Sequence, residues 1–345
     1  MKTQHALLLL LMLVGVGCQP TPQVSQQHST GNGIYYWKTT FELNDNERAF
    51  LKTHQVNRLY LRLFDVVATD DETQNLQFSV TPNATIVFRD SIPENVEVVP
   101  VVYITIDALR KMQGHEDDYA KLITERVMNM ADFNDLGPIN EVQLDCDWTK
   151  QTQDSYFALC SRTGNILKEN DILISCTIRL WQLSKRCPPV DRGVLMLYNT
   201  GNLMAENTDN SILDLDQVKA FLKGKTYPLP LSLAYPTFEW CVWFRDGQYQ
   251  GLFHDLDLKD GTLYQCIQDN RFEVLKDHIA ENRELKKSDH IRYESVDFDL
   301  LQRLDDIVHQ KMASADDAPI IIYHLDSANL SKYSQDEIRQ IYCRH

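Results

Sequence analysis

Hydrophobic residues along this chain recur with two different periods, and segments of the two kinds follow one another in order. Residues 58–65 alternate strictly between leucine and another residue, which is the period of a half-buried β-strand. Segments with apolar residues at helical spacing separate most such runs. Strands are predicted at 34–37, 58–65, 97–105, 141–149, 172–179, 193–198, 229–235 and 320–324. Helices are predicted at 44–53, 117–133, 153–168, 213–222, 298–312 and 334–342.

Strands that are mostly separated by helices predict a parallel α/β architecture. A (β/α)8 barrel fits both the number of strands and the length of the chain. A doubly wound open sheet is the alternative, but no strand is followed by a glycine-rich phosphate-binding turn of the form GxGxxG or GxxxxGK[ST]. We therefore expect residues 34–345 to form a single barrel domain.

The pattern changes after the seventh predicted strand. Two short strand-like runs, 240–244 and 249–253, flank the pair Asp246 and Gly247, which favours the tight turn of a β-hairpin. Further hairpin-like segments continue to about residue 295. A β-hairpin insertion after strand 7 is predicted.

The amino-terminal residues have the pattern of a lipoprotein signal peptide. Lys2 precedes a short apolar run that ends in Gly-Val-Gly before Cys18, and this run is too short to span a membrane. The ending resembles a bacterial lipobox, in which the cysteine is acylated and becomes the mature amino terminus; an ordinary signal peptide that contains a cysteine is the alternative. We expect residues 1–17 to be removed and residues 18–33, rich in Gln, Ser and Pro, to be a flexible tether.

A lipidated Cys18 would anchor the protein to a membrane of the bacterial cell envelope, with the outer membrane as the preferred location. The folded domain would then lie outside the cytoplasm.

Composition and charge mainly exclude classes of function. Of the 345 residues, 43% are hydrophobic and 24% charged, as in a globular protein with a full core. A net charge of −15 argues against a nucleic-acid partner, because little basic surface is left to neutralise phosphates. No zinc-ligand spacing, HExxH or GxSxG motif occurs, so neither a metal nor a cofactor is expected. The cysteines allow one or two disulfides at most.

The fourth predicted strand carries the most distinctive polar pattern. One face is apolar and the other presents Gln143, Asp145 and Asp147. Two like charges one pleat apart are costly to hold together without a cation, a proton or a ligand. Arg62 or Arg179 on nearby strands could pair with Asp145, which we interpret as the structural acid, leaving Asp147 at the mouth of the barrel to act on a ligand. Alternatively, both acids only hold arginines and loop amides in place.

The carboxyl ends of the strands are where (β/α)8 barrels carry their active sites. Here these ends are polar or aromatic, whereas the strand starts are mostly Val, Ile and Leu. Flat apolar rings with a polar handle, beside acids and an arginine, fit a sugar, although the same rings could cap the barrel core. The predicted substrate-binding residues are Trp37, Asp65, Trp148, Arg179, Tyr198, Asn199 and Tyr235.

Glycoside hydrolysis requires two carboxyl groups that flank the scissile bond. Asp147 is the first candidate for acid/base chemistry, with Asp145 beside it. Glu239, just after the seventh strand, is the candidate partner, unless it is a solvated hairpin residue. Weaker options are Asp65, Asp107 and Asp326. An Asp-x-Asp motif can also hold a metal beneath a nucleotide-sugar, but such substrates are not expected outside the cytoplasm.

The spacing of Asp145 and Asp147 resembles the strand-four motif of chitinase-like barrels, in which alternating acids end with a catalytic glutamate. Thr149 stands at the glutamate position, which argues against a chitinase-type mechanism. As a whole, the chain resembles lipoproteins of Bacteroidetes-type bacteria that carry a glycosidase-like TIM barrel. The likeness covers the lipobox, the stretch from Leu144 to Thr149, residues 194–203 and residues 229–238.

This resemblance, together with the aromatic strand ends, leaves two functions open. The first is a lipid-anchored barrel that binds a glycan and hydrolyses it. The second is a non-catalytic binding or assembly lipoprotein on the same scaffold.

Overall fold

The strands predicted from alternation close into one parallel barrel in the computed structural model, which describes residues 31–69, 80–222, 227–312 and 314–343. Around the barrel the order is β1, β3, β6, β7, β8, β9, β10 and β18, and β1 pairs with both β3 and β18 to close it. The bounds are β1 Asn32–Tyr36, β3 Val56–Ala68, β6 Glu97–Ile104, β7 Glu141–Asp145, β8 Leu173–Arg179, β9 Arg192–Met196, β10 Leu231–Pro236 and β18 Ile320–Tyr323. The predicted (β/α)8 barrel is confirmed, and the open sheet is excluded.

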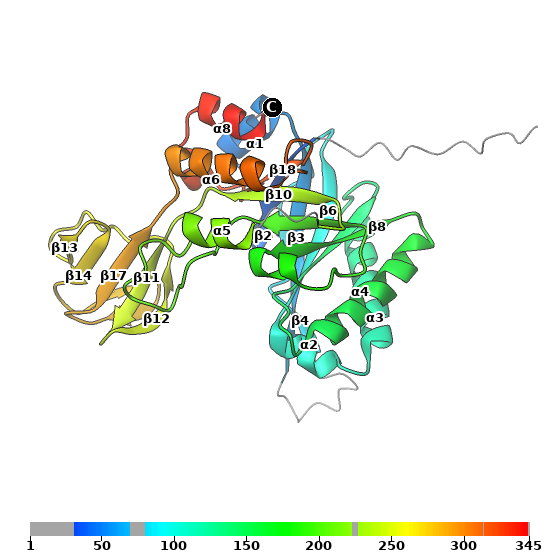
Figure 1. Ribbon diagram of the computed structural model, residues 1–345, viewed down its shortest axis with the longest axis horizontal. Coiled ribbons are helices and arrows are strands. Elements are labelled where there is room, and N and C mark those ends of the chain that lie inside the picture. Colours follow the sequence, from blue (N-terminus) through cyan, green and yellow to red (C-terminus); the bar gives the residue numbers. More distant parts are fainter. Residues whose placement is uncertain (1–30, 70–79, 223–226, 313, 344–345) are drawn as a thin grey trace, which may run out of the picture. The chain divides into compact units, whose positions relative to one another are not determined.

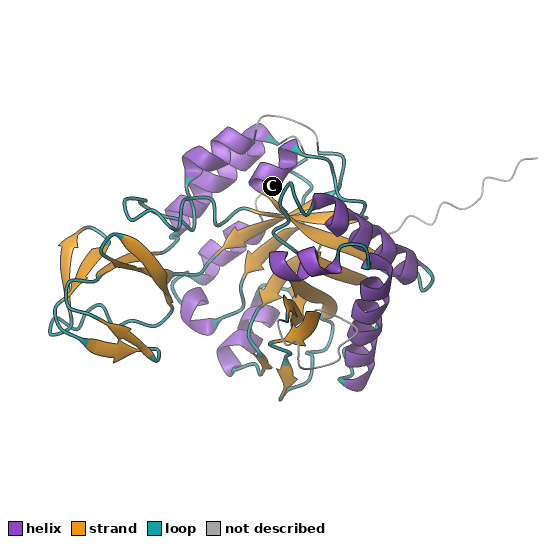
Figure 2. Cartoon of the chain, turned by 90° about the horizontal axis from the view of Figure 1, so that it is seen from below, coloured by secondary structure: helices purple, strands orange, loops and turns teal. Residues whose placement is uncertain are grey.

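Helices surround the barrel strands (Figure 2). The six predicted helices are present within a few residues of their expected ends. Asn44 caps α1 as expected, because its side chain accepts from the amide of Glu47 at 3.0 Å and the Glu47 carboxylate accepts from the Asn44 amide. The helices are α1 Asp45–Thr53, α2 Ile106–Met112, α3 Glu116–Phe133, α4 Gln153–Lys168, the 3-10 helix Leu180–Ser184, α5 Leu215–Phe221, α6 Phe298–Lys311, α7 Ser327–Leu330 and α8 Gln335–Tyr342. The short α2, α7 and 3-10 helix were not predicted.

Polar side chains occupy the barrel interior, as the alternation on the fourth strand predicts. The Tyr35 hydroxyl donates to Gln143 Oε1 at 2.7 Å, and Gln143 Nε2 donates to Ser175 Oγ at 3.4 Å. At the amino end of β7, Glu141 accepts from Arg58 at 2.8 Å and from Arg192 at 3.4 Å. Buried charges are tolerated here because each has an opposite charge within hydrogen-bonding distance.

The segment after β10 contains the predicted hairpin and further strands up to residue 294, as the hairpin-like pattern to about residue 295 indicated. The hairpin itself is present, with β11 Trp240–Arg245 and β12 Gln248–Phe253 joined at Asp246 and Gly247, whose φ angles are 50° and 72°. These strands join three others in an antiparallel sheet of order β12-β11-β17-β14-β13 (Figure 1). The other strands are β13 Tyr264–Gln268, β14 Arg271–Val274 and β17 His290–Glu294, with β15 His278–Ala280 and β16 Arg283–Leu285 as a separate pair.

Residues 240–294, here called the insertion, have their own hydrophobic cluster, which includes Trp243, Phe253 and Ile291. The described residues of the barrel and of the insertion nevertheless belong to one compact unit. Three short strands complete the structure: β4 Val80–Asn83 pairs with β3, and β2 Thr40–Phe41 pairs with β5 Val87–Phe88.

The predicted signal peptide, Cys18 and most of the tether lie outside the described residues. The last two tether residues, Asn32 and Gly33, belong instead to β1. In the described part of the chain, the seven cysteines are free, and no helix is both long enough and apolar enough to cross a membrane.

Candidate ligand-binding site

A cleft of about 930 Å³ lies at the carboxyl ends of the barrel strands. Each of the eight strands, or the loop that follows it, contributes to its wall, because parallel strands bring all their carboxyl ends to one rim. The insertion adds Trp240, Leu252, His254 and Asp255. The predicted site residues that line the cleft are Trp37, Asp65, Asp145, Asp147, Arg179, Tyr198, Asn199 and Glu239.

Two predicted substrate-binding residues lie elsewhere. Trp148 is 0% exposed and packs edge to face against Phe157, because it follows Asp147 and its side chain points the opposite way. Tyr235 lies on the outer face of β10, where its hydroxyl donates to Asp305 Oδ1 of α6 at 2.7 Å. Successive side chains of an extended chain point in opposite directions, and these two point away from the cleft. The prediction that Trp148 and Tyr235 line the cleft is corrected accordingly.

Asp147 is held by a two-pronged ion pair. Arg179 Nε donates to Asp147 Oδ1 at 2.5 Å, and Arg179 Nη2 donates to Oδ2 at 2.6 Å. The two residues meet because β7 and β8 are neighbours in the barrel. The Asp147 side chain remains 37% exposed, whereas that of Arg179 is 18% exposed. The arginine that we expected beside Asp145 therefore neutralises Asp147.

Asp145 lies deeper and has a different partner. It is 5% exposed, and Thr177 Oγ1 donates to its Oδ1 at 2.6 Å. Burial and the charge of Asp147 raise the pKa of Asp145 to about 6, against the lowering effects of the Thr177 hydroxyl and the Arg179 charge. The expected direct arginine partner of Asp145 is therefore not observed: Arg179 bonds to Asp147 and acts on Asp145 only as a neighbouring charge. Burial pushes Asp145 towards the protonated form.

The remaining cations of the cleft are also paired with acids. Arg62 forms a two-pronged pair with Asp65, and its guanidinium lies 5.4 Å from the centre of the Trp37 ring. Lys38 Nζ lies 2.6 Å from Glu47 and 3.3 Å from Asp326. Every lysine and arginine that lines the cleft thus has a carboxylate partner among the described residues.

Glu239 lines the cleft and directly precedes the insertion. Its carboxylate accepts from the Tyr293 hydroxyl and pairs with Lys332. Burial, with the neighbouring Glu239 charge, raises the pKa of Tyr293 to about 12, so this hydroxyl stays protonated and continues to donate. Glu239 is a fixed acid at the rim and does not belong to a hairpin, since β11 begins at Trp240.

Three aromatic residues of the cleft were missed in the sequence: Tyr103, Phe238 and Tyr323. Tyr323 is central, because its ring centroid lies 4.9 Å from that of Tyr198, 5.5 Å from Phe238 and 5.7 Å from Trp37. Their place near the ends of predicted strands was the available signal. This position alone did not identify them as cleft residues, because alternation does not reveal which side chains of other strands a residue will contact.

Thr149, where chitinase-like barrels have a glutamate, is outside the cleft lining. Its amide donates to Thr152 Oγ1 at 2.9 Å, just before α4. Across the residues that the structure describes, no group of three or more His, Cys, Asp or Glu side chains is placed to hold a metal ion.

Comparison with known proteins relates the chain to solved structures only through its fold. No family model and no curated protein matches the sequence. The spore cortex-lytic enzyme SleL of Bacillus cereus superposes with a TM-score of 0.52 at 12% identity, over 90% of this chain and 73% of that one. A chitinase of Chromobacterium violaceum gives 0.50 at 11% identity, over 87% and 98%. Chitinase ChiA74 of Bacillus thuringiensis gives 0.50 at 11% identity, over 91% and 69%. The chain therefore shares the (β/α)8 barrel fold of these proteins.

Proposed function

We propose that this protein binds a glycan without acidic groups in the cleft at the carboxyl ends of the barrel strands. The observation that carries the proposal is the contiguous aromatic cluster in the cleft lining formed by Trp37, Tyr198, Phe238 and Tyr323. Sugar rings offer apolar C–H faces that pack on such rings, and their hydroxyls bond to the surrounding polar groups. The chitinase and cortex-lytic activities of the structural neighbours are consistent with a glycan ligand.

The charges of the cleft favour a neutral or basic glycan over an acidic one. Its lysine and arginines are already paired with carboxylates. Burial lowers the pKa of His324 to about 4, so this ring is uncharged at neutral pH. A uronate, sulfate or phosphate group would therefore find no unpaired lysine or arginine in the lining, and would meet Asp145 and Asp255.

Binding is favoured over hydrolysis by the absence of a carboxyl group at Thr149 and by the fixed pairing of Asp147 with Arg179. Hydrolysis is the second candidate, and the raised pKa of Asp145 favours it. A carboxylic acid with a pKa of about 6 can donate a proton to a leaving oxygen near neutral pH. In that reaction Asp145 would take the acid/base role that was first assigned to Asp147. Asp147 or Glu239 would supply the second carboxylate.

A binding screen with a turnover assay tests both candidates. The purified protein is titrated with cellohexaose, maltohexaose and the N-acetylglucosamine hexamer, and reducing ends are measured. We expect binding of at least one neutral hexasaccharide, weakened about tenfold or more by Trp37→Ala, which deletes a stacking surface. If none of the probes binds, or if Trp37→Ala binds as well as wild type, the proposal is wrong. Turnover that is lost in Asp145→Asn would establish the second candidate.

The lipid anchor is part of the proposal and is supported by the lipobox-like residues before Cys18. We propose that acylated Cys18 holds the barrel at a membrane of the cell envelope. Metabolic labelling with palmitate should mark the wild-type protein and leave Cys18→Ala unlabelled. Equal labelling of both would contradict the anchor.

A further inference from the structure

Trp240 forms part of the cleft wall, and a carboxylate of the insertion holds its indole from outside the barrel. Trp240 opens β11 and is the direct cross-strand partner of Glu294 on β17. Its Nε1 donates to Glu294 Oε2 at 2.6 Å. Its ring packs edge to face on Phe238, with 5.2 Å between the centroids. Since an indole has only one N–H, this bond consumes its hydrogen-bonding capacity and leaves the ring as an apolar surface.

Glu294 is a buried carboxylate that holds several donors at once. It is 1% exposed, and Ser211 Oγ donates to the same Oε2 at 2.5 Å. Its other oxygen, Oε1, accepts from Arg292 Nε at 2.6 Å. Both oxygens are therefore occupied, and the Oε2 that holds Trp240 also holds a residue of the barrel.

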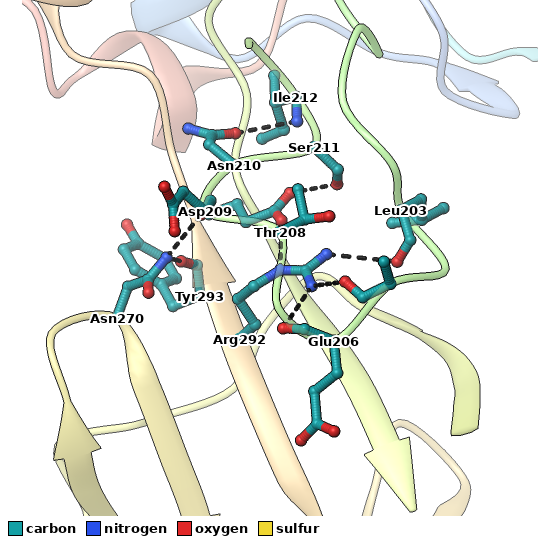
Figure 3. A network of polar contacts seen from close by, with 12 residues as sticks. Leu203, Glu206, Thr208, Asp209, Asn210, Ser211, Ile212, Asn270, Arg292 and Tyr293 are labelled. Atoms are coloured by element: carbon teal, nitrogen blue, oxygen red, sulfur yellow. Dashed lines mark hydrogen bonds and ion pairs between the residues drawn. The ribbon is translucent and has the colours of Figure 1, made fainter. Parts of the chain in front are cut away.

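Arg292 ties this carboxylate to residues 202–212, here called the β9–α5 loop. Its side chain is 1% exposed and points into the loop (Figure 3). Its remaining N–H groups donate, at 2.5 to 3.3 Å, to the main-chain carbonyls of Leu203, Ala205 and Glu206. A buried ion pair is held in place when its remaining donors are satisfied in this way. The carbonyls of the β9–α5 loop thus hold Arg292, and Arg292 holds the Glu294 carboxylate in place.

Additional bonds join the same loop to the insertion. Arg271 Nη2 donates to the Thr208 carbonyl at 3.1 Å. Asn270 Nδ2 donates to the Asp209 carbonyl at 3.1 Å (Figure 3). From the loop, Asn210 Nδ2 donates to the carbonyl of Ser295 at 2.8 Å. Side-chain to main-chain bonds therefore connect the loop to the start of β14 and to the residue that follows β17.

We propose that Glu294 is a positioning residue for ligand binding, which fixes the Trp240 ring in the orientation that stacks on a sugar. The inference rests on the proposed glycan-binding function. A ring held by its N–H from behind loses less conformational freedom when a ligand packs on its face. The orientation of this wall of the cleft is then set by a buried ion pair of the insertion and by the β9–α5 loop.

Two substitutions separate positioning from packing. Trp240→Phe keeps an aromatic ring and removes the N–H that Glu294 holds. Trp243→Phe is the matched control on the same strand, because Trp243 Nε1 also donates to a buried carboxylate, Asp289 Oδ2, at 2.8 Å. Trp243 belongs to the hydrophobic cluster of the insertion and does not line the cleft. Both variants therefore lose a hydrogen bond from an indole N–H to a buried carboxylate, and they differ in whether the ring lines the cleft.

The full-length protein is titrated with the three neutral hexasaccharides named above. We expect Trp240→Phe to weaken the binding of the recognised hexasaccharide by about fivefold or more, because a ring that Glu294 no longer holds must be ordered when the ligand packs on it. Trp243→Phe should stay within about twofold of wild type, with its effect confined to stability. Equal affinity of wild type and Trp240→Phe would overturn the inference and leave the proposed function intact.

A spectroscopic readout tests the positioning itself. In ¹⁵N-tryptophan-labelled protein, the Trp240 indole N–H should be protected from solvent exchange. Ser211→Ala, which removes the other donor from Oε2, should shift the Trp240 indole resonance and leave that of Trp243 unchanged. A freely exchanging Trp240 indole, or one that does not respond to Ser211→Ala, would overturn the inference. If wild type binds none of the hexasaccharides, the proposed function is wrong and these spectra alone decide whether Glu294 fixes the ring.

Discussion

Arg179 and Asp147 meet at the mouth of the barrel through two parallel hydrogen bonds of 2.5 and 2.6 Å. Of Asp145 and Asp147, the more exposed acid is therefore the one that pairs with the arginine. The deeper acid, Asp145, has a threonine hydroxyl. A planar guanidinium matches both oxygens of a carboxylate, and the carboxylate that β8 brings within its reach is that of Asp147. The division of roles between the two acids follows from this pairing.

Removing the arginine should disturb both acids. In Arg179→Gln, Asp147 loses its two-pronged partner, and the pKa of Asp145 loses the lowering effect of the Arg179 charge. We expect the free energy of unfolding to fall by about 1–2 kcal/mol, a modest cost because Asp147 is partly exposed. The pKa of Asp145 should rise further, as followed by carboxyl ¹³C titration. As a control, Arg186→Gln breaks an exposed pair with Asp154 and should cost less than about 0.5 kcal/mol; equal costs for the two variants would contradict the prediction.

Asp145 should make the protein less stable as the pH rises from about 4 to about 6. Its folded-state pKa of about 6 lies above the ordinary aspartate value of about 4, so the folded state binds more protons in that window. The stability that protonation confers is complete below the unfolded pKa and is lost as the pH passes the folded pKa. Asp145→Asn, which can still accept from Thr177, should flatten this dependence and be more stable than wild type at pH 7 by about 1–2 kcal/mol. Denaturation curves at pH 4 and pH 7 measure the effect, and an unchanged slope with pH would argue against it.

Acidic glycans should bind more weakly than neutral ones. Because the lining cations are paired, we expect hexagalacturonate to bind at least about tenfold more weakly than the best neutral hexasaccharide. Neutral binding should change little between low and physiological salt. Titration calorimetry at two salt concentrations checks both statements. Tighter, salt-dependent binding of the uronate would show that a cation of the cleft is available after all.

Tyr235 should affect stability and leave ligand binding unchanged. Tyr235→Phe removes the hydroxyl that donates to Asp305 on the outer face of the barrel, at a cost of about 1 kcal/mol. Affinity for the recognised glycan should remain within about twofold of wild type. Tyr198→Phe is the contrasting variant, because Tyr198 lines the cleft. A loss of affinity in Tyr235→Phe comparable to that of Trp37→Ala would restore Tyr235 to the binding site.

The ion pair at the opposite end of the barrel should affect stability alone. Glu141→Gln removes the buried carboxylate that pairs with Arg58 and Arg192, while Arg58 keeps its pair with Glu97 at 3.3 Å. The free energy of unfolding should fall by about 3 kcal/mol. Glycan binding should persist wherever the variant is folded, because Glu141 begins β7 whereas the cleft lies beyond its carboxyl end. A small cost would show that water reaches this end of the barrel.

Local pattern in the sequence was sufficient for the barrel itself. Strict alternation along residues 58–65 marks β3, and the interval between strands leaves room for helices such as α4, whose ends match the prediction. Alternation also placed Gln143, Asp145 and Asp147 on one face, because the direction of a strand side chain depends only on its parity. The composition and charge of the chain needed no structure to argue against nucleic-acid binding.

Only the tertiary structure decided which side chains are partners. Arg179 could reach either Asp145 or Asp147 on sequence grounds, and the register between β7 and β8 selects Asp147. Trp148 was predicted to lie at the mouth of the barrel, but it is buried and its ring contacts that of Trp181. The hold of Glu294 on Trp240 joins residues 54 positions apart. Such contacts depend on strand register and loop path, which arise from packing across the whole domain and leave no periodic signal in the chain.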